Sequence, residues 1–272
     1  MAINFSEKYS GKIAEVFTHE SFLKGLFTAK LDFTGAKTVK VYRLVTVAEN
    51  DYQRTGTNRY GTPTDVQDVV DEYTMTQDKS FSQVVDKGDG SDQAISNKAG
   101  AWLKAQLREQ SAPAADKYAL SKLVAEGTAL SLGAAPDKDS VVDMFVKART
   151  AFTNTLVPDS GRYALIPASS YAYIPLAPQF VNLEKLGTPA VGKGHVGQLL
   201  GFNLIEMPDQ YFPEGIHTIF LHESAACMPY KLDETHIHKD PPGISGALIE
   251  GRHYYDCFVL QNKKNAVLAA KT

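Results

Sequence analysis

The sequence predicts an α+β protein, in which helices and mixed β-sheets share one chain of 272 residues. Three observations predict this fold class. Residues 71–86 alternate between apolar and polar side chains, as a strand does when only one of its faces is covered. Residues 92–126 instead carry apolar side chains at helical spacing. A further helix signal at residues 136–152 precedes three short strand signals.

The composition limits the classes of function. Hydrophobic residues make up 43% and charged residues 22% of the chain, which are ordinary values for a folded protein. The net charge of -3 gives no general attraction for nucleic acid or for an anionic membrane. The most apolar stretch, residues 163–181, is interrupted by three prolines, so we expect no segment that spans a bilayer. Cys227 and Cys257 show neither zinc-binding spacing nor a disulfide framework.

The first element in chain order is an aromatic-rich arm at residues 5–31, with Phe5, Phe17 and Phe22 among its large side chains. Its helical periodicity is patchy. An arm of this length cannot bury so many aromatic side chains by itself. We therefore expect it to lie against the rest of the chain or against a neighbouring subunit.

Two strands joined by a long polar loop follow the arm. The strands are predicted at residues 38–47 and 71–86. The 21 residues between 48 and 68 have almost no core-forming side chains, yet they include Tyr52 and Tyr60. Loops longer than about 12–15 residues in compact domains are usually functional or disordered. We expect a projecting hairpin that a partner orders.

The main helical region is predicted at residues 92–126. Pro113 lies inside it, and a proline removes one backbone hydrogen bond and clashes with the preceding turn. We therefore expect a kink at Pro113 and two helical pieces that form one long bent element.

The next helix is predicted at residues 136–152, with Asp137, Asp139 or Ser140 as its N-cap. Its apolar stripe consists of Val141, Met144, Phe145, Ala148 and Phe152.

Short strands are predicted at residues 162–167, 202–207 and 217–222, which with this helix describe a mixed α/β layer. Residues 246–260 are apolar on both faces and turn at 262–265 into 266–269. This last pattern predicts a buried hairpin that closes the fold.

No motif predicts catalysis. Residues 192–197 read GKGHVG and match the glycine pattern of dinucleotide-binding loops, but no strand signal precedes them and no helix signal follows. A nucleotide-binding enzyme is therefore only a remote alternative. His236 and His238 would share one face of a strand, but they have no third ligand at a typical spacing, so a surface feature is favoured over a metal site. We expect no catalytic residue, metal ion or cofactor, and no enzyme.

The succession of segments resembles the major capsid proteins of tailed bacteriophages, which have the Hong Kong 97-type fold, and in particular the compact coat proteins of phages of Gram-positive bacteria. The resemblance runs nearly from end to end. The matching segments are FTGAKTVKVYRL, NDYQRTGTNRYGTP, EYTMTQDKSFSQVVDKGD, DKYALSKLVAEG at the end of the helical region, VPDSGRYALIPASSY and HKDPPGISGALIEGRHYYDCFVLQNKK.

The resemblance implies four parts. They are an N-terminal arm at residues 1–36, an extended β-hairpin loop at 37–86, a peripheral domain with a long spine helix at 87–127 and 229–272, and an α/β axial domain at 128–228. It further implies a virion coat subunit that assembles with copies of itself into pentamers and hexamers of an icosahedral head. Assembly would take place in the host bacterial cytoplasm, and the shell would enclose double-stranded DNA without sequence-specific binding.

The resemblance also implies the partners of such a subunit. A portal protein and, because the chain enters the arm at once, a separate scaffolding protein are expected, and a membrane is not. The sequence leaves open whether a decoration protein binds. Some relatives crosslink through a lysine in the extended loop, but no lysine lies between Lys40 and Lys79, so we expect no crosslink here. Encapsulins, which are bacterial nanocompartment shells with the same fold, are the alternative. Contacts between subunits are expected at Phe5, Phe17, Phe22, Tyr52, Arg54, Arg59 and Tyr60.

Overall fold

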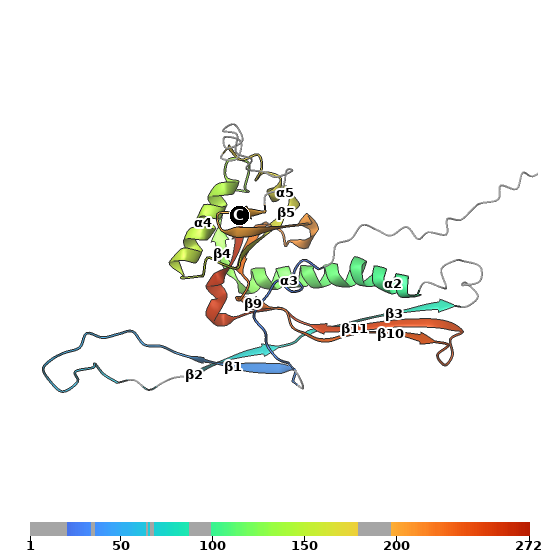
Figure 1. Cartoon of the computed structure of the whole chain (residues 1–272), viewed down its shortest axis with the longest axis horizontal. Helices are drawn as coiled ribbons and strands as arrows, with labels where there is room; N and C mark the ends of the chain where they lie inside the picture. Colours follow the sequence, from blue (N-terminus) through green and yellow to red (C-terminus); the bar gives the residue numbers. More distant parts are fainter. Residues whose placement is uncertain (1–20, 34–35, 64, 66–67, 87–98, 179–196) are drawn as a thin grey trace, which may run out of the picture.

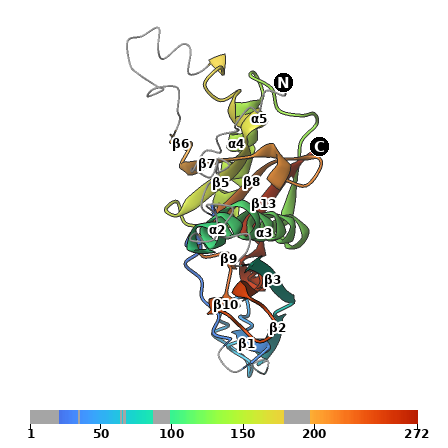
Figure 2. The same ribbon diagram turned by 90° about the vertical axis from the view of Figure 1, so that its right-hand side faces the viewer.

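The computed structural model describes residues 21–33, 36–63, 65, 68–86, 99–178 and 197–272. A long helix separates an upper α/β layer from a lower layer of extended strands, and a two-stranded hairpin projects sideways from the lower layer (Figure 1). The same layers lie above one another in the view turned by 90° (Figure 2).

The upper layer is built on a six-stranded mixed sheet. Its strands, in spatial order, are β4 (Thr128–Ser131), β13 (Val267–Lys271), β8 (Ile216–His222), β5 (Arg162–Pro167), β7 (Phe202–Met207) and β6 (Gln198–Leu199). The pairs β4–β13 and β5–β7 are parallel, and the other pairs are antiparallel. The three short strands expected from the sequence are thus confirmed as β5, β7 and β8.

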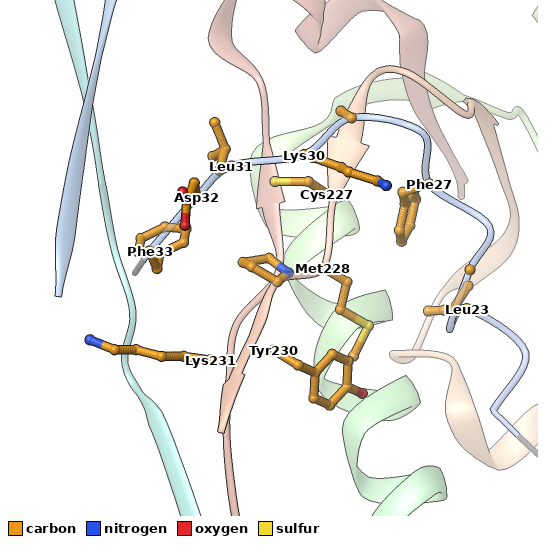
Figure 3. Close-up of a pocket in the computed structure, with 13 residues that line it drawn as sticks. Leu23, Phe27, Lys30, Leu31, Asp32, Phe33, Cys227, Met228, Tyr230 and Lys231 are labelled. Carbon is orange, nitrogen blue, oxygen red and sulfur yellow. The ribbon is translucent and has the colours of Figure 1, made fainter. Parts of the chain in front are cut away.

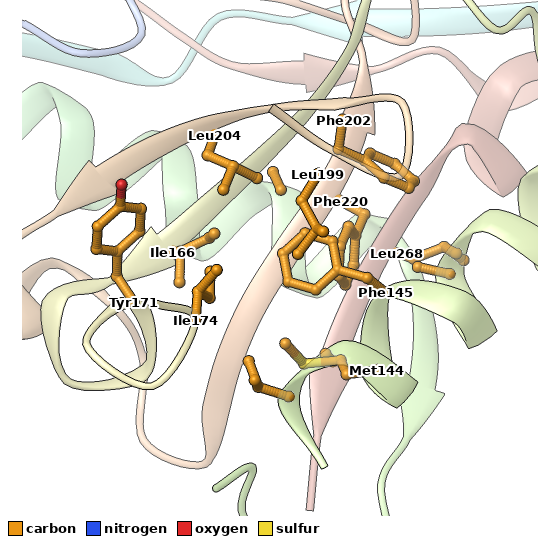
Figure 4. Close-up of a cluster of buried hydrophobic side chains, with 14 of the residues drawn as sticks. Met144, Phe145, Ile166, Tyr171, Ile174, Leu199, Phe202, Leu204, Phe220 and Leu268 are labelled. Atoms are coloured by element: carbon orange, nitrogen blue, oxygen red, sulfur yellow. The ribbon is translucent and has the colours of Figure 1, made fainter. Parts of the chain in front are cut away.

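Helix α4 (Val141–Asn154) covers one face of this sheet. It begins after Ser140, whose backbone N–H and hydroxyl both donate to a carboxylate oxygen of Asp137, at 2.8 and 2.6 Å. The predicted apolar stripe is confirmed, because all five of its residues are buried. Figure 4 shows Met144 and Phe145 of the helix beside Phe202, Phe220 and Leu268 of the sheet. The short helix α5 (Ala168–Tyr171) completes this face.

A buried arginine locks the end of α4 to the sheet. Arg162 is 2% exposed, and its guanidinium lies against the rings of Phe152 and Phe202. Its nitrogens donate to the carbonyl oxygens of Pro158 at 2.8 Å and Val157 at 2.6 Å. These bonds, together with the ion pair to Asp159 at 2.9 Å, satisfy a charge that would otherwise be costly to bury.

The long helix covers the opposite face of the sheet. It runs through α2 (Ala99–Gln106), a π-helical segment η2 (Leu107–Ser111) and α3 (Ala112–Glu126). Pro113 stands in the first turn of α3, directly after the π-helical segment. The backbone N–H of Ala112 bonds to the carbonyl of Leu107, one residue further back than in an α-helix. Of the predicted helix 92–126, residues 92–98 lie outside the described residues.

Gly127 ends this helix where it meets the sheet. Its N–H donates to the carbonyl of Leu123 at 2.9 Å. A Cβ at this position would lie 2.8 Å from the side chain of Val267, so only glycine allows the approach to β13.

The lower layer contains a three-stranded antiparallel sheet, in the order β10 (Tyr230–Lys239), β11 (Gly246–Tyr255) and β3 (Gln77–Asp86). One prediction is wrong here. The expected single strand at residues 71–86 is two strands in two sheets, because the chain leaves β2 (Asp68–Thr74) and crosses to β11 at Met75 and Thr76. The alternation continues through the crossing, so it gave no sign of the break.

The predicted C-terminal hairpin is also wrong. After β11 the chain forms the short strand β12 (Phe258–Val259), which pairs with β9 (Ala226–Cys227), and the 3-10 helix η4 (Gln261–Ala266). It then enters the six-stranded sheet as β13, between β4 and β8. The four residues Val267–Ala270 are all buried, and a strand that is apolar on both faces requires a central position in a covered sheet. The last strand therefore joins the sheet of the predicted axial part, not the peripheral part assigned to 229–272.

Candidate assembly surfaces

The projecting loop, residues 45–67, connects two paired strands. β1 (Thr38–Leu44) and β2 are antiparallel, with Leu44 opposite Asp68 at the open end. The ion pair between Lys40 and Glu72, with nitrogen and oxygen 2.6 Å apart, crosses this pair of strands. Beyond it the loop extends far from the rest of the chain (Figure 1). The strand pair thus supports a projecting segment in which none of the described residues is buried.

The tip of the projecting loop has local order and carries the predicted contact residues. The rings of Tyr52 and Tyr60 meet edge to face with centroids 5.0 Å apart, yet Tyr60 remains 86% exposed and Tyr52 51%. The N–H of Gln53 donates to the carbonyl of Arg59 at 3.0 Å, and Arg59 Nε donates to the carbonyl of Gly56 at 3.2 Å. The tip is therefore a preformed turn that presents aromatic rings to the solvent.

Both arginines of the tip are exposed. Neither Arg54 nor Arg59 forms an ion pair with another described residue. Tyrosine and arginine are the residues most enriched at the energetic centres of protein interfaces. The structure brings these four predicted residues together on one tip, and their contact with another subunit stays a prediction.

The arm, residues 21–33, lies along its own chain. Leu23 and Phe33 are buried, and the ring of Phe22 meets that of Tyr211 edge to face with centroids 6.2 Å apart. Phe22 is half-buried and makes this contact within its own subunit, and its predicted contact with another subunit stays a prediction. Phe5 and Phe17 lie outside the described residues.

Asp116 of α3 anchors the arm. Its side chain is buried and accepts hydrogen bonds from the hydroxyl of Ser21 at 2.6 Å and from the N–H of Phe22 at 2.9 Å. A carboxylate that accepts two such bonds holds the chain more firmly than neutral acceptors do.

Replacing Asp116 with alanine is expected to release the start of the arm. Cleavage near residues 21–27 by a dilute protease should become faster by on the order of tenfold to a hundredfold, because two charge-assisted hydrogen bonds are lost. Ser21→Ala removes only one of them and should have a smaller effect. Equal cleavage rates in Asp116→Ala and the unaltered chain would contradict this anchoring role.

A shallow cavity of about 530 Å³ lies between the arm and the segment that leads into β10. Figure 3 shows Leu23, Phe27 and Phe33 on the arm side, with Met228 and Tyr230 opposite. The lining contains no group of titratable side chains arranged for catalysis. Lys231 instead donates to the carbonyl of Ala36 at 2.7 Å and helps to fix the end of the arm.

Asp256 connects the projecting hairpin to the long helix through hydrogen bonds. It is completely buried, and its two oxygens accept four hydrogen bonds. Thr76 donates through its N–H at 2.7 Å and its hydroxyl at 2.9 Å, the Tyr118 hydroxyl donates at 2.7 Å, and the Cys257 N–H donates at 2.8 Å. Burial raises the pKa of Tyr118 to about 12, so this hydroxyl remains a donor at neutral pH.

Among the described residues, the histidines and cysteines offer no reactive arrangement. His236 and His238 lie stacked on β10, and each has one carboxylate within 4 Å, from Glu234 and Glu250. In the described part of the chain, no three His, Cys, Asp or Glu side chains are grouped to hold a metal ion. Cys227 is buried, as expected from its apolar surroundings, and burial raises the pKa of its thiol to about 12. The glycine motif at 192–196 lies outside the described residues.

Sequence reasoning missed the buried polar groups that organise these surfaces. Asp116 and Asp256 look like any surface carboxylates in the sequence, and their partners are about 95 to 180 residues away. No local pattern could have identified them.

None of the described helices is long and apolar enough to cross a membrane.

Comparison with known proteins gives a likeness of structure. No family model matches the sequence, and no curated protein matches it. A structure from Mycobacterium phage Che8 is 23% identical, with a TM-score of 0.80 over 99% of this chain and 98% of that chain. The capsid structure of cyanophage P-SCSP1u is 12% identical, with a TM-score of 0.79 over 98% and 92%.

The asymmetric unit of the mature capsid of bacteriophage PhiM1 is also 12% identical, with a TM-score of 0.77 over 98% of this chain and 92% of that chain. The likeness therefore covers every described layer, including the projecting loop. It confirms the fold class expected from the sequence: the chain has the α+β fold of phage capsid proteins.

Proposed function

We propose that this chain is a major capsid protein, the coat subunit that assembles with copies of itself into the shell of a phage head. The observation that carries the proposal is the likeness to capsid structures over more than nine tenths of both chains. The projecting loop supports it independently, because an extended tip with exposed tyrosines and arginines has no role in an isolated subunit.

We further propose a structure for the assembled particle. The subunits form pentamers and hexamers of an icosahedral head in the host cytoplasm, and the head encloses double-stranded DNA. A net charge of -3 suits this role, because a mildly acidic wall does not retain the phosphates that must later be released. A separate scaffolding protein, a portal protein and a decoration protein are the proposed partners.

Two alternatives receive no support. An encapsulin-type compartment has the same predicted fold, but no observation favours cargo enzymes over a genome. A nucleotide-binding enzyme would depend on residues 192–197, of which 192–196 lie outside the described residues, and no other observation favours it.

Light-scattering mass measurement with negative-stain imaging of the purified chain tests the proposal. We expect closed shells, or discrete species whose mass is five or six times 29.7 kDa. Adding the scaffolding partner should raise the yield of shells. A chain that stays monomeric at all concentrations, with and without that partner, would contradict the coat function.

A further inference from the structure

The strand β10 forms one edge of the three-stranded sheet. It pairs with β11 on one side and with no other described strand. Residues 233–240 are exposed without interruption. An edge strand of this length presents a row of unpaired backbone N–H and C=O groups to which another strand can bind. The edge of β10 is therefore a candidate site for strand pairing.

The ladder with β11 shows which backbone groups of β10 point to the open edge. The register is regular from residue 232 to residue 239. Directly after it, the N–H of Asp240 donates to the carbonyl of Gly246 at 2.7 Å, so this N–H points toward the β11 side. Successive residues of a strand point their backbone groups to opposite sides. The residues whose N–H and C=O groups point to the open edge are therefore Asp233, Thr235, Ile237 and Lys239.

The features that block edge pairing lie only at the ends of β10. The register shifts between Tyr230 and Leu232, and lysines occupy positions 231 and 239. The strand contains no proline. Bulges, lysines and prolines are the usual means of protecting an edge, and the middle of this strand has none of them. Another strand can therefore approach the outward positions.

A second copy of the same edge uses all four outward residues at once. When two β10 strands run antiparallel about a two-fold axis at His236, Asp233 lies opposite Lys239 of the second copy, and Thr235 lies opposite Ile237. The pairing would form about eight hydrogen bonds, two for each bonded pair. A shift by one residue would turn side chains to the wrong face, and a shift by two would leave one outward residue outside the regular ladder.

The charges agree with this register. Asp233 would lie opposite Lys239 of the second copy, and Glu234 would lie opposite His238, so no two like charges would face each other. Asp233, Glu234 and His238 already have partners within the subunit, yet their side chains are between 43% and 57% exposed and can make a further contact. The charge pairs thus favour the register, and the backbone hydrogen bonds supply the contact itself.

We infer that the edge of β10 pairs antiparallel with the same edge of a second copy, about a two-fold axis at His236, and so joins two three-stranded sheets into one sheet. Because both copies contribute the same surface, the contact is complete with two subunits. In a shell it would link neighbouring pentamers and hexamers across a two-fold axis. This inference rests on the proposed coat function and assigns it a contact separate from the projecting loop.

Thr235→Pro tests the pairing, because a proline at an outward position removes a donor only from the open edge. The ladder with β11 should stay intact, so the melting temperature of the subunit should change by no more than about 2–4 °C. The yield of shells should fall by about tenfold or more, because both copies lose a donor beside the axis. Thr235→Ala keeps the N–H and is the matched control, with a yield close to that of the unaltered chain. Shells at normal yield from a folded Thr235→Pro chain would overturn the inference.

His236→Cys tests the register. In the inferred contact this position faces itself across the axis, with Cα atoms about 4.5 Å apart, which a disulfide can bridge. Mild oxidation should therefore join the chains of this variant into dimers on a denaturing gel without reductant.

Glu234→Cys is the matched control for this register. Its Cα would lie about 13 Å from the same atom of the second copy, so it should form no dimer. Cys227 and Cys257 are buried and should not react. The absence of dimers from His236→Cys, or equal dimer yields from both variants, would contradict the register.

Failure of the inference is distinguishable from failure of the proposed function. If the unaltered chain forms shells and Thr235→Pro does so equally well, only the contact assigned to β10 is wrong. If the unaltered chain forms no shells but His236→Cys still forms dimers, the strand pairing is supported and the coat function is contradicted.

Discussion

We expect that replacing the projecting loop, residues 45–67, with a two-residue Asn-Gly turn leaves a chain that folds as a subunit but forms no shells. Leu44 and Asp68 lie opposite each other in the ladder, so a two-residue turn can close the hairpin directly after them. The loop buries almost none of its own side chains, and its removal should shift the melting temperature by no more than a few degrees. Assembly should fall below detection in light scattering.

Point variants identify which part of the loop is responsible. Tyr60→Ala and Arg59→Ala each remove one exposed side chain from the tip and should reduce the assembly yield by about tenfold or more, as interface anchors do. Thr57→Ala is the matched control, because it lies on the same tip and removes only a small side chain. Shells formed at normal yield by the loop-replaced chain would show that the loop is no assembly element.

Replacing Asp256 with alanine is expected to lower the free energy of unfolding by about 3–5 kcal/mol, because four hydrogen-bond donors lose one buried acceptor group. The N–H groups of Thr76 and Cys257 and the hydroxyls of Thr76 and Tyr118 would all lose this acceptor. The change should appear in denaturant unfolding of the subunit as a lower midpoint with an unchanged slope.

Tyr118→Phe is the matched control for this prediction. It removes one of the four donors and leaves the carboxylate bonded to Thr76 and Cys257, so a loss of about 1 kcal/mol is expected. If Asp256→Ala costs no more than Tyr118→Phe, the buried carboxylate does not hold the hairpin to the long helix.

The sequence predicted those elements whose packing shows in their own periodicity. The stripe of α4 was correct residue by residue, because one covered face repeats every 3.6 residues whatever lies against it. The short strands β5, β7 and β8 were also found. The long polar loop was recognised for the opposite reason, since a segment without core residues cannot be packed inside a single chain.

The errors arose where a strand changes partner. The alternation of residues 71–86 is the same on both sides of Thr76, so it could not reveal that the chain leaves one sheet for another there. The turn signal at 262–265 is real, but it leads into a 3-10 helix and then into a different sheet. Strand periodicity reports which faces are covered and says nothing of what covers them.

The residues of the candidate contact surfaces were also only partly predictable from the sequence. The sequence identified the tyrosines and arginines of the projecting loop, because exposed aromatics in a polar segment are conspicuous without a structure. It suggested a contact of Phe22 with a neighbouring subunit, which stays a prediction, and the tertiary structure adds a contact of that ring with Tyr211 of its own chain. It gave no sign that Leu156, directly after α4, has a left-handed backbone with φ +58 and a side chain that is 90% exposed.

By itself, the sequence determined an α+β chain with an arm, a projecting loop, a long helix interrupted near Pro113 and a helix-covered sheet. The tertiary structure decided which strands pair, where the last strand inserts and which carboxylates are buried. The physical reason is the separation along the chain of the residues that interact. Helical and strand periods are set by neighbours a few residues apart, whereas Asp116 and Asp256 meet partners from distant parts of the chain. Such long-range contacts form only when the layers pack against one another.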